Sequence, residues 1–267
     1  MFVKADRIKE QVYKLCSFDR NADNPQGLHD CANYIKSQIT NPNAHITEQI
    51  FQIDSNIYRN LKVTFGDNPI KTVLGAHYDA YGESPGADDN ASSCALLIEL
   101  CNILSYQDVE VVFFALEEPP IFGSINMGSY IYANSKGVIQ AKAPFKPVDI
   151  KYMINFEMLG YYTDYNSVID VAVYNSPTLH GYTIDLLGKD KNFIVGDTTT
   201  IMSYRDNADH MWFLENGIAT MIVSKSKPFM NKNYHTRKDS PETLNYEMME
   251  ITYNKIIGFV LDLLERE

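Results

Sequence analysis

The sequence predicts a single α/β domain: a mixed, mostly parallel twisted sheet flanked by helices on both faces. The chain has 267 residues, of which 45% are hydrophobic and 21% charged, as in an ordinary globular domain. Beyond about residue 71, short apolar segments alternate with helical ones, as in βαβ units. No repeat, linker or low-complexity tract interrupts the chain, so residues 1–267 are expected to form one domain.

The first seventy residues are expected to add helices and strands to this same domain. Ile8, Val12 and Leu15 are spaced as on one face of a helix, which predicts a helix over 4–19. A second helix should end before the turn pair Asn41–Pro42. Segments 45–53 and 57–65 read as strands. No functional motif is apparent in residues 1–70.

The remaining elements follow from the same periodicities. Strands are predicted at 71–76, 109–116, 150–156, 168–174 and 219–223. Helices are predicted at 92–105, 126–134, 178–187, 209–215 and 243–264. Segment 109–116 is almost continuously apolar, which is typical of a strand covered on both faces.

Charge and hydropathy exclude several function classes. Acidic residues number 34 and basic residues 23, and a net charge of −11 argues against nucleic-acid binding. No segment approaches the roughly 20 apolar residues that cross a bilayer, so no membrane role is expected. The N-terminus lacks the apolar core of a signal peptide, which predicts a cytoplasmic protein. A chain trimmed after signal cleavage would look the same, so a secreted or periplasmic origin is the alternative; the oligomeric state stays open.

Acidic and imidazole side chains gather where predicted strands end. His77 and Asp79 follow strand 71–76, the pair Glu117–Glu118 follows strand 109–116, and Glu157 follows strand 150–156. Each alone has an ordinary explanation as a solvated loop residue. Together they lie where open α/β sheets bind ligands. Two carboxylates at the end of so apolar a strand need compensation, and a cation is the simplest candidate.

The residue types favour one kind of metal. Imidazole and carboxylate ligands without thiolate suit Zn²⁺, with Co²⁺ or Mn²⁺ as substitutes. The four cysteines form no CxxC pair and read as buried thiols, not as a zinc–sulfur site or a disulfide framework. Zinc with an open position lowers the pKa of a bound water to about 7. A neighbouring carboxylate that does not bind the metal can then serve as general base.

Five ordered segments carry a family resemblance. They are GAHYDAYGESPGADDNASS (75–93), FFALEEPPIFGS (113–124), INFEMLG (154–160), ADHMWFLENGIA (208–219) and YHTRKDS (234–240). With them the sequence resembles the co-catalytic zinc peptidases of the M28 type, which include bacterial leucyl aminopeptidases and, as relatives, glutaminyl cyclases. The resemblance covers about residues 71–245 and implies the zinc-exopeptidase fold.

The resemblance implies a ligand set for two zinc ions, with a single ion as the alternative. His77, Asp89 and Glu157 match the ligands of one ion. Asp89, Glu118 and His235 match those of the other, so that Asp89 would bridge the two. The family usually has Asp where this chain has Glu157, so the ion on the His77 side is expected to be the weaker.

Further roles are implied for residues that do not bind metal. Glu117 matches the general base, and Asp79 matches the acid that orients the first imidazole. Asp209 falls where the family places an acid near the catalytic water, and Tyr204 or Tyr234 could donate to the oxyanion. The resemblance also implies a cis peptide after the bridging Asp89.

Three functions remain open from the sequence. The favoured one is a metal-dependent exopeptidase, and its motifs favour an aminopeptidase that acts on peptide N-termini through a metal-bound hydroxide with Glu117 as general base. The second is a glutaminyl cyclase, an acyltransferase whose single zinc would be held by Asp89, Glu118 and His235. The third is an inactive binding domain that kept the fold, which the complete set of ligands and base disfavours.

Overall fold

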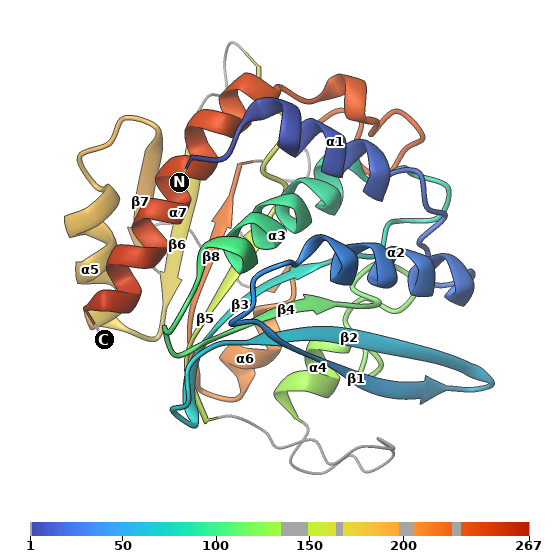
Figure 1. Ribbon diagram of the computed structural model, residues 1–267, viewed down its shortest axis with the longest axis horizontal. Helices are drawn as coiled ribbons and strands as arrows, with labels where there is room; N and C mark the ends of the chain where they lie inside the picture. The colour runs from blue at the N-terminus through green and yellow to red at the C-terminus, as the bar shows by residue number, and fades with distance from the viewer. Residues whose placement is uncertain (1, 135–148, 164–167, 198–205, 226–230, 267) are drawn as a thin grey trace.

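The computed structural model describes residues 2–134, 149–163, 168–197, 206–225 and 231–266 (Figure 1). Its eight strands form one sheet in the order β1-β2-β4-β3-β5-β8-β6-β7. The strands are β1 (His45–Ile53), β2 (Asn56–Thr64), β3 (Ile70–His77), β4 (Val109–Phe114), β5 (Asp149–Glu157), β6 (Ile169–Tyr174), β7 (Phe193–Asp197) and β8 (Ala219–Ser224). The central strands β4, β3, β5 and β8 run parallel, whereas β1–β2, β2–β4 and β6–β8 pair antiparallel. The predicted mixed, mostly parallel sheet is confirmed.

Helices cover both faces of this sheet. They are α1 (Ala5–Leu15), α2 (Pro25–Gln38), α3 (Ser93–Ile103), α4 (Gly128–Ala133), α5 (Pro177–Leu187), α6 (Met211–Glu215) and α7 (Tyr246–Glu265), with two short turns, η1 (Ala87–Ser92) and η4 (Pro241–Thr243). Figure 1 shows α1, α3 and α7 lying together on one side of the sheet. Helices α4 and α6 contribute Tyr132 and Phe213 to a separate apolar cluster on the other side.

Alternation along β4 explains why its sequence is apolar throughout. Val111 and Phe113 join the large core under α1, α3 and α7. Val112 and Phe114 join the cluster under α4 and α6. Since successive side chains of a strand point to opposite faces, a strand covered on both faces needs apolar residues at every position.

Polar caps set where several helices begin. The side chain of Asn24 accepts a hydrogen bond from the amide of Gly27 at the start of α2, and Ser176 and Asn245 cap α5 and α7 in the same way. Such caps satisfy amides that the helix itself leaves without partners. Among the described residues, no helix combines the length and apolarity needed to cross a membrane.

The structure corrects several predicted boundaries and adds one strand. The strand predicted at 109–116 ends at Phe114, because Leu116 has a positive φ of 63° and turns the chain away from the sheet. The helices predicted at 4–19 and 209–215 are shorter, and η1 adds a distorted helical turn ahead of the helix predicted at 92–105. The edge strand β7 was not predicted. All four cysteines are free thiols; Cys31, Cys94 and Cys101 are buried as expected, whereas Cys16 is half-buried.

Candidate metal centre

Neighbouring parallel strands bring the predicted residues to one edge of the sheet. His77 is the last residue of β3, and Glu157 is the last residue of β5. Gly75 pairs with Asn155 in this ladder, so the two functional side chains lie two residues further along adjacent strands. His77 Nε2 lies 3.3 Å from Glu157 Oε1, and both residues are buried. The Asn155 side chain donates to the other oxygen of Glu157 at 3.4 Å.

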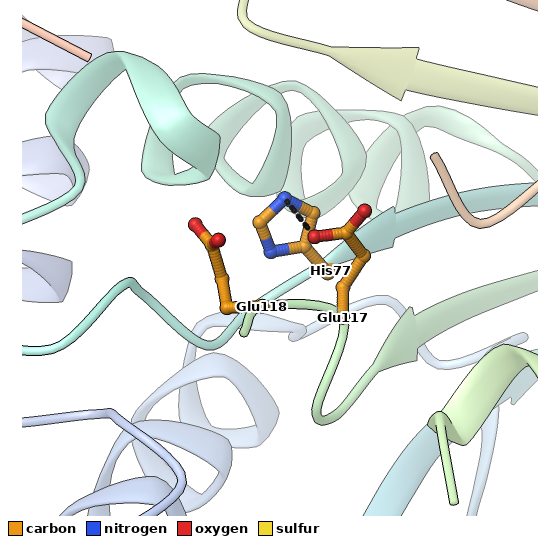
Figure 2. Close-up of side chains that lie close together, drawn as sticks. All are labelled: His77, Glu117 and Glu118. Carbon is orange, nitrogen blue, oxygen red and sulfur yellow. Dashed lines mark ion pairs between the residues drawn. The ribbon is translucent and has the colours of Figure 1, made fainter. Parts of the chain in front are cut away.

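The Glu117–Glu118 pair follows β4 and is held by Asp79. The backbone amides of Glu117 and Glu118 donate to the two carboxylate oxygens of Asp79 at 3.1 and 3.0 Å. Asp79 Oδ1 also lies 3.4 Å from His77 Nδ1. One buried carboxylate thus anchors the backbone of the acidic pair and lies beside the imidazole of His77. Figure 2 shows His77 lying between the two glutamates, with Glu117 Oε2 3.9 Å from Nε2.

Asp89 joins the two halves of the site. It lies in η1, immediately before a cis peptide to Asn90, as the family resemblance implied. Its Oδ1 is 3.2 Å from His77 Nε2, and its Oδ2 is 3.4 Å from His235 Nε2. The two carboxylate oxygens therefore face different imidazoles, as a bridging ligand requires.

His235 reaches the site from a loop and is held between two tyrosines. Its φ is +57°, and Nε2 lies 2.9 Å from Glu118 Oε2. The ring stacks on Tyr81 at 4.2 Å and 7°, and on Tyr234 at 3.7 Å and 20°. Both tyrosine rings lie close to the imidazole and nearly parallel to it. If they were on the same face of the imidazole, they would overlap each other, so they must lie on opposite faces. The imidazole is therefore sandwiched, which fixes the orientation of the ring.

The donor set fits zinc. Three groups of side chains have ligand atoms that all lie within 4.8 Å of one another: His77 with Glu117 and Glu118, His77 with Asp89 and Glu157, and Asp89 with Glu118 and His235. In a tetrahedral zinc site with bonds of 2.0–2.1 Å, neighbouring ligand atoms lie about 3.3–3.4 Å apart. The distances from Asp89 to both histidines, 3.2 and 3.4 Å, match that spacing. Glu118 Oε1 is buried and has no hydrogen-bond partner among the described residues.

Crowding of acids shifts the pKa of nearly every group in the site. Burial raises the pKa of Glu117 well above its usual value, and neighbouring acids reinforce this, although His77 opposes it. Burial and the adjacent Asp89 raise the pKa of Glu118 to about 8. Burial lowers the pKa of His235, but hydrogen bonds to Asp89 and Glu118 outweigh it and bring the pKa to about 9. Without a cation, the negative charge of these buried carboxylates is not fully neutralised by the two histidines. A bound metal ion would supply the missing positive charge.

The turn that carries Asp89 is anchored by its own neighbours. The side chain of Asn90 donates to Phe156 O at 3.0 Å and accepts from the amide of Met158 at 3.1 Å, so that it brackets Glu157. Asp88 accepts from the amides of Gly160 and Tyr161, two contacts for which the sequence carries no signal.

A second anchor comes from the last motif. The two carboxylate oxygens of Asp239 accept from the backbone amides of Asp88 and Asp89 at 3.0 and 3.2 Å. Asp239 lies four residues after His235, inside a segment that the sequence singled out for its histidine alone. The contact could not be predicted from the sequence, because Asp239 lies 150 residues after Asp89.

The other predicted residues lie around this centre. Asp209 is fully buried just before α6, and burial raises its pKa to about 7, with His77 opposing the shift and Glu157 adding to it. Burial raises the pKa of the Tyr234 phenol, and the charges of Asp89 and Glu118 raise it further. Tyr204 lies outside the described residues.

Comparisons with known proteins identify the family. The model of peptidase family M28 matches residues 56–260. The Escherichia coli uncharacterized protein YfbL is 30% identical over 89% of this chain and 81% of its own length. Aminopeptidase YwaD of Bacillus subtilis is 22% identical over 75% of this chain, which spans only 42% of that protein.

Solved structures share the fold. The Legionella pneumophila LapA aminopeptidase superposes with a TM-score of 0.74 at 21% identity, over 97% of this chain and 72% of its own. The Bacteroides thetaiotaomicron glutaminyl cyclase bound to N-acetylhistamine superposes with a TM-score of 0.73 at 18% identity, over 97% of this chain and 99% of its own. These two likenesses concern the fold alone, whereas the family match covers most of the chain. The chain belongs to peptidase family M28.

Proposed function

We propose that this protein is a zinc-dependent aminopeptidase that removes N-terminal residues from peptides. The observation that carries the proposal is the placement of Asp89 between two imidazoles, with one carboxylate oxygen directed at each. The family is one of peptidases, and several relatives, including YwaD, are named aminopeptidases. The activity of those longer relatives supports the proposal for this chain.

Each ion would have its own protein ligands. His77, Asp89 and Glu157 would hold one ion, and Asp89, Glu118 and His235 the other. When bound, such ions supply Lewis-acid activation of a water and of the scissile carbonyl. A single ion on the second set is the alternative, and Co²⁺ or Mn²⁺ would be expected to substitute for Zn²⁺.

Glu117 would act as the general base. It lies within reach of His77 but is not needed to complete either of the two ligand sets that share Asp89. Burial holds its pKa high, so that its carboxylate binds a proton readily. Glu117 would take a proton from the attacking water and deliver it to the nitrogen of the leaving amine. Asp79 would keep the base in place through the backbone amide of Glu117.

The excess of acid suggests how a free N-terminus is recognised. Besides the ligands, the site holds the buried carboxylates of Glu117, Asp79 and Asp209. A protonated α-amine would neutralise part of this charge, which favours aminopeptidase action over cleavage within a chain. Tyr234, stacked on His235, would donate from its phenol to the developing oxyanion.

Metal removal tests the proposal. Dialysis against phenanthroline should abolish hydrolysis of Leu-p-nitroanilide, because no described group could replace the activated water as nucleophile. Zn²⁺ or Co²⁺ should restore the activity, and Mn²⁺ should restore part of it. Full hydrolysis by protein shown to be free of metal would refute the proposal.

A glutaminyl cyclase is the second candidate. It is favoured by the longer side chain of Glu157 where the family usually has Asp, which could leave the His77 side without an ion. Cyclisation of Gln-naphthylamide in the absence of Leu-p-nitroanilide hydrolysis would identify this activity. The reverse result would identify the aminopeptidase.

A further inference from the structure

Arg20 is a buried cation with an unusual set of partners. It follows α1 in a segment where the sequence showed no functional motif, and 2% of the residue is exposed. Its guanidinium donates to five backbone carbonyls: Nε to Leu15 at 3.3 Å, Nη1 to Tyr78 and Asp79 at 3.2 and 2.6 Å, and Nη2 to Pro85 and Gly86 at 2.8 and 2.6 Å.

Four of these carbonyls belong to the two ends of one loop, residues 78–86, and the fifth belongs to Leu15, the last residue of α1. Tyr78 and Asp79 follow directly on the ligand His77, and Gly86 stands three residues before the bridging Asp89. The amide of Ala80 also donates to the carbonyl of Arg20 itself at 3.1 Å. A single side chain thus closes loop 78–86 and ties the segment carrying one ligand to the segment carrying the next.

The contact extends to the catalytic pair. Arg20 fixes the main chain of Asp79, whose carboxylate in turn accepts from the amides of Glu117 and Glu118. Gly86 has a φ of +62°, and a Cβ added there would lie 2.7 Å from Nη2 of Arg20. The loop is therefore shaped to receive the guanidinium closely.

Only arginine can make this set of contacts. The guanidinium offers five N–H donors in a rigid planar fork, and all five positions are used here. A lysine ammonium offers three donors from a single point, so it could hold one end of the loop but could not span both.

We propose that Arg20 is a positioning residue of the metal centre, which holds loop 78–86 in the shape that brings His77 and Asp89 to a common ion. The proposal rests on the proposed function. It makes the N-terminal segment, which precedes the 56–260 match to the family, part of the metal-binding unit.

The test compares zinc affinity in Arg20→Lys and Arg20→Ala with that of the full-length parent protein, measured by competition with a chromophoric chelator. Loss of residues that orient metal ligands typically costs about 10–100-fold in metal affinity, and both variants should lose that much. Added guanidinium ion at millimolar concentration should restore zinc binding to Arg20→Ala and leave Arg20→Lys unchanged. Ile35→Val, in the buried face of α2, controls for a general loss of stability.

Thermal melts recorded beside the titrations separate positioning from simple stabilisation. If Arg20→Lys melts earlier but binds zinc as tightly as the parent, the proposal is wrong and Arg20 is only a structural residue. If Arg20→Ala does not fold, the lysine variant decides alone. If the parent protein itself binds no zinc, the proposed function is wrong. That result does not depend on either variant.

Discussion

The two halves of the candidate metal centre are built in different ways. The His77 pole consists of His77, Glu157 and Oδ1 of Asp89, and two of its residues end neighbouring strands of the sheet. The His235 pole consists of Glu118, His235 and Oδ2 of Asp89, and its own two residues lie on loops. The side chain of His77 is 1% exposed, whereas that of His235 is 22% exposed.

This difference shows where each pole can adapt. Strand pairing fixes the backbone of His77 and Glu157, so at these two residues only the side chains can absorb a change in ligand length. Glu157, one methylene longer than the usual Asp, must do this at the cost of an additional immobilised torsion. Loop backbone and aromatic stacking position the His235 pole instead. We therefore expect the His77 pole to bind its ion more weakly.

The largest expected effect separates the two glutamates. Glu117→Gln should keep zinc and lose kcat by about 10²–10⁴-fold, the usual contribution of a general base. Glu118→Gln, one residue away, should instead lose the ion of the His235 pole. Zinc content and steady-state kinetics measured together would show the contrast. Loss of zinc from Glu117→Gln would mean that the roles of the two residues are exchanged.

Glu157→Ala tests the weaker pole. Calorimetric titration of the metal-free parent with Zn²⁺ should show two steps, and the variant should lack only the weaker one. Asn155→Ala is the milder control, because it removes only a side chain that donates a hydrogen bond to Glu157. If Glu157→Ala keeps both steps and its activity, Glu157 is not a ligand and the site is closer to that of a one-zinc cyclase.

Much of this comparison could be foreseen from the sequence, and part of it could not. Strand ends carrying His77 and Glu157 were predictable because periodicity locates strands and parallel strands share an edge. The supporting contacts were not: Arg20 and Asp239 act on backbone atoms of residues up to 151 positions away. Nothing in a single sequence specifies such contacts between a side chain and a distant backbone atom.

Strand β7 was missed for another reason. It is a five-residue edge strand whose sequence FIVGD carries little periodicity.

The pH dependence of stability should differ between metal-free and zinc-loaded protein. Burial raises the pKa of Glu118 to about 8 and that of Asp209 to about 7. The metal-free folded protein therefore holds protons that the unfolded chain would release, and these two groups lower the free energy of unfolding as the pH rises. His235, with its pKa raised to about 9, stabilises the folded state fully below about pH 6.5 and loses this contribution as pH rises. All three contributions have the same sign.

The Tm of chelator-treated protein should therefore fall from about pH 5 to pH 9. Zinc keeps the carboxylates ionised, so the loaded protein should show a flatter or opposite slope. A Tm of metal-free protein that stays constant or rises over this range would contradict the account.

The smallest expected effect concerns the aromatic sandwich of the His235 pole. Tyr81→Leu removes one of the two stacked rings, and aromatic pairs are typically worth about 0.5–1.5 kcal/mol. Zinc affinity at this pole should fall by about two- to tenfold, while the His77 pole should not change. Tyr81→Phe keeps the ring and should bind like the parent. Equal losses in both variants would show that the hydroxyl group, not stacking, is responsible.

Zinc stoichiometry tests the central claim, two poles joined by Asp89, most directly. Native mass spectrometry of zinc-reconstituted protein should count two ions per chain in the parent and one in each of His77→Ala and His235→Ala. A parent that holds one ion, and keeps it when His77 is replaced, would contradict the two-pole centre and support the one-zinc arrangement instead.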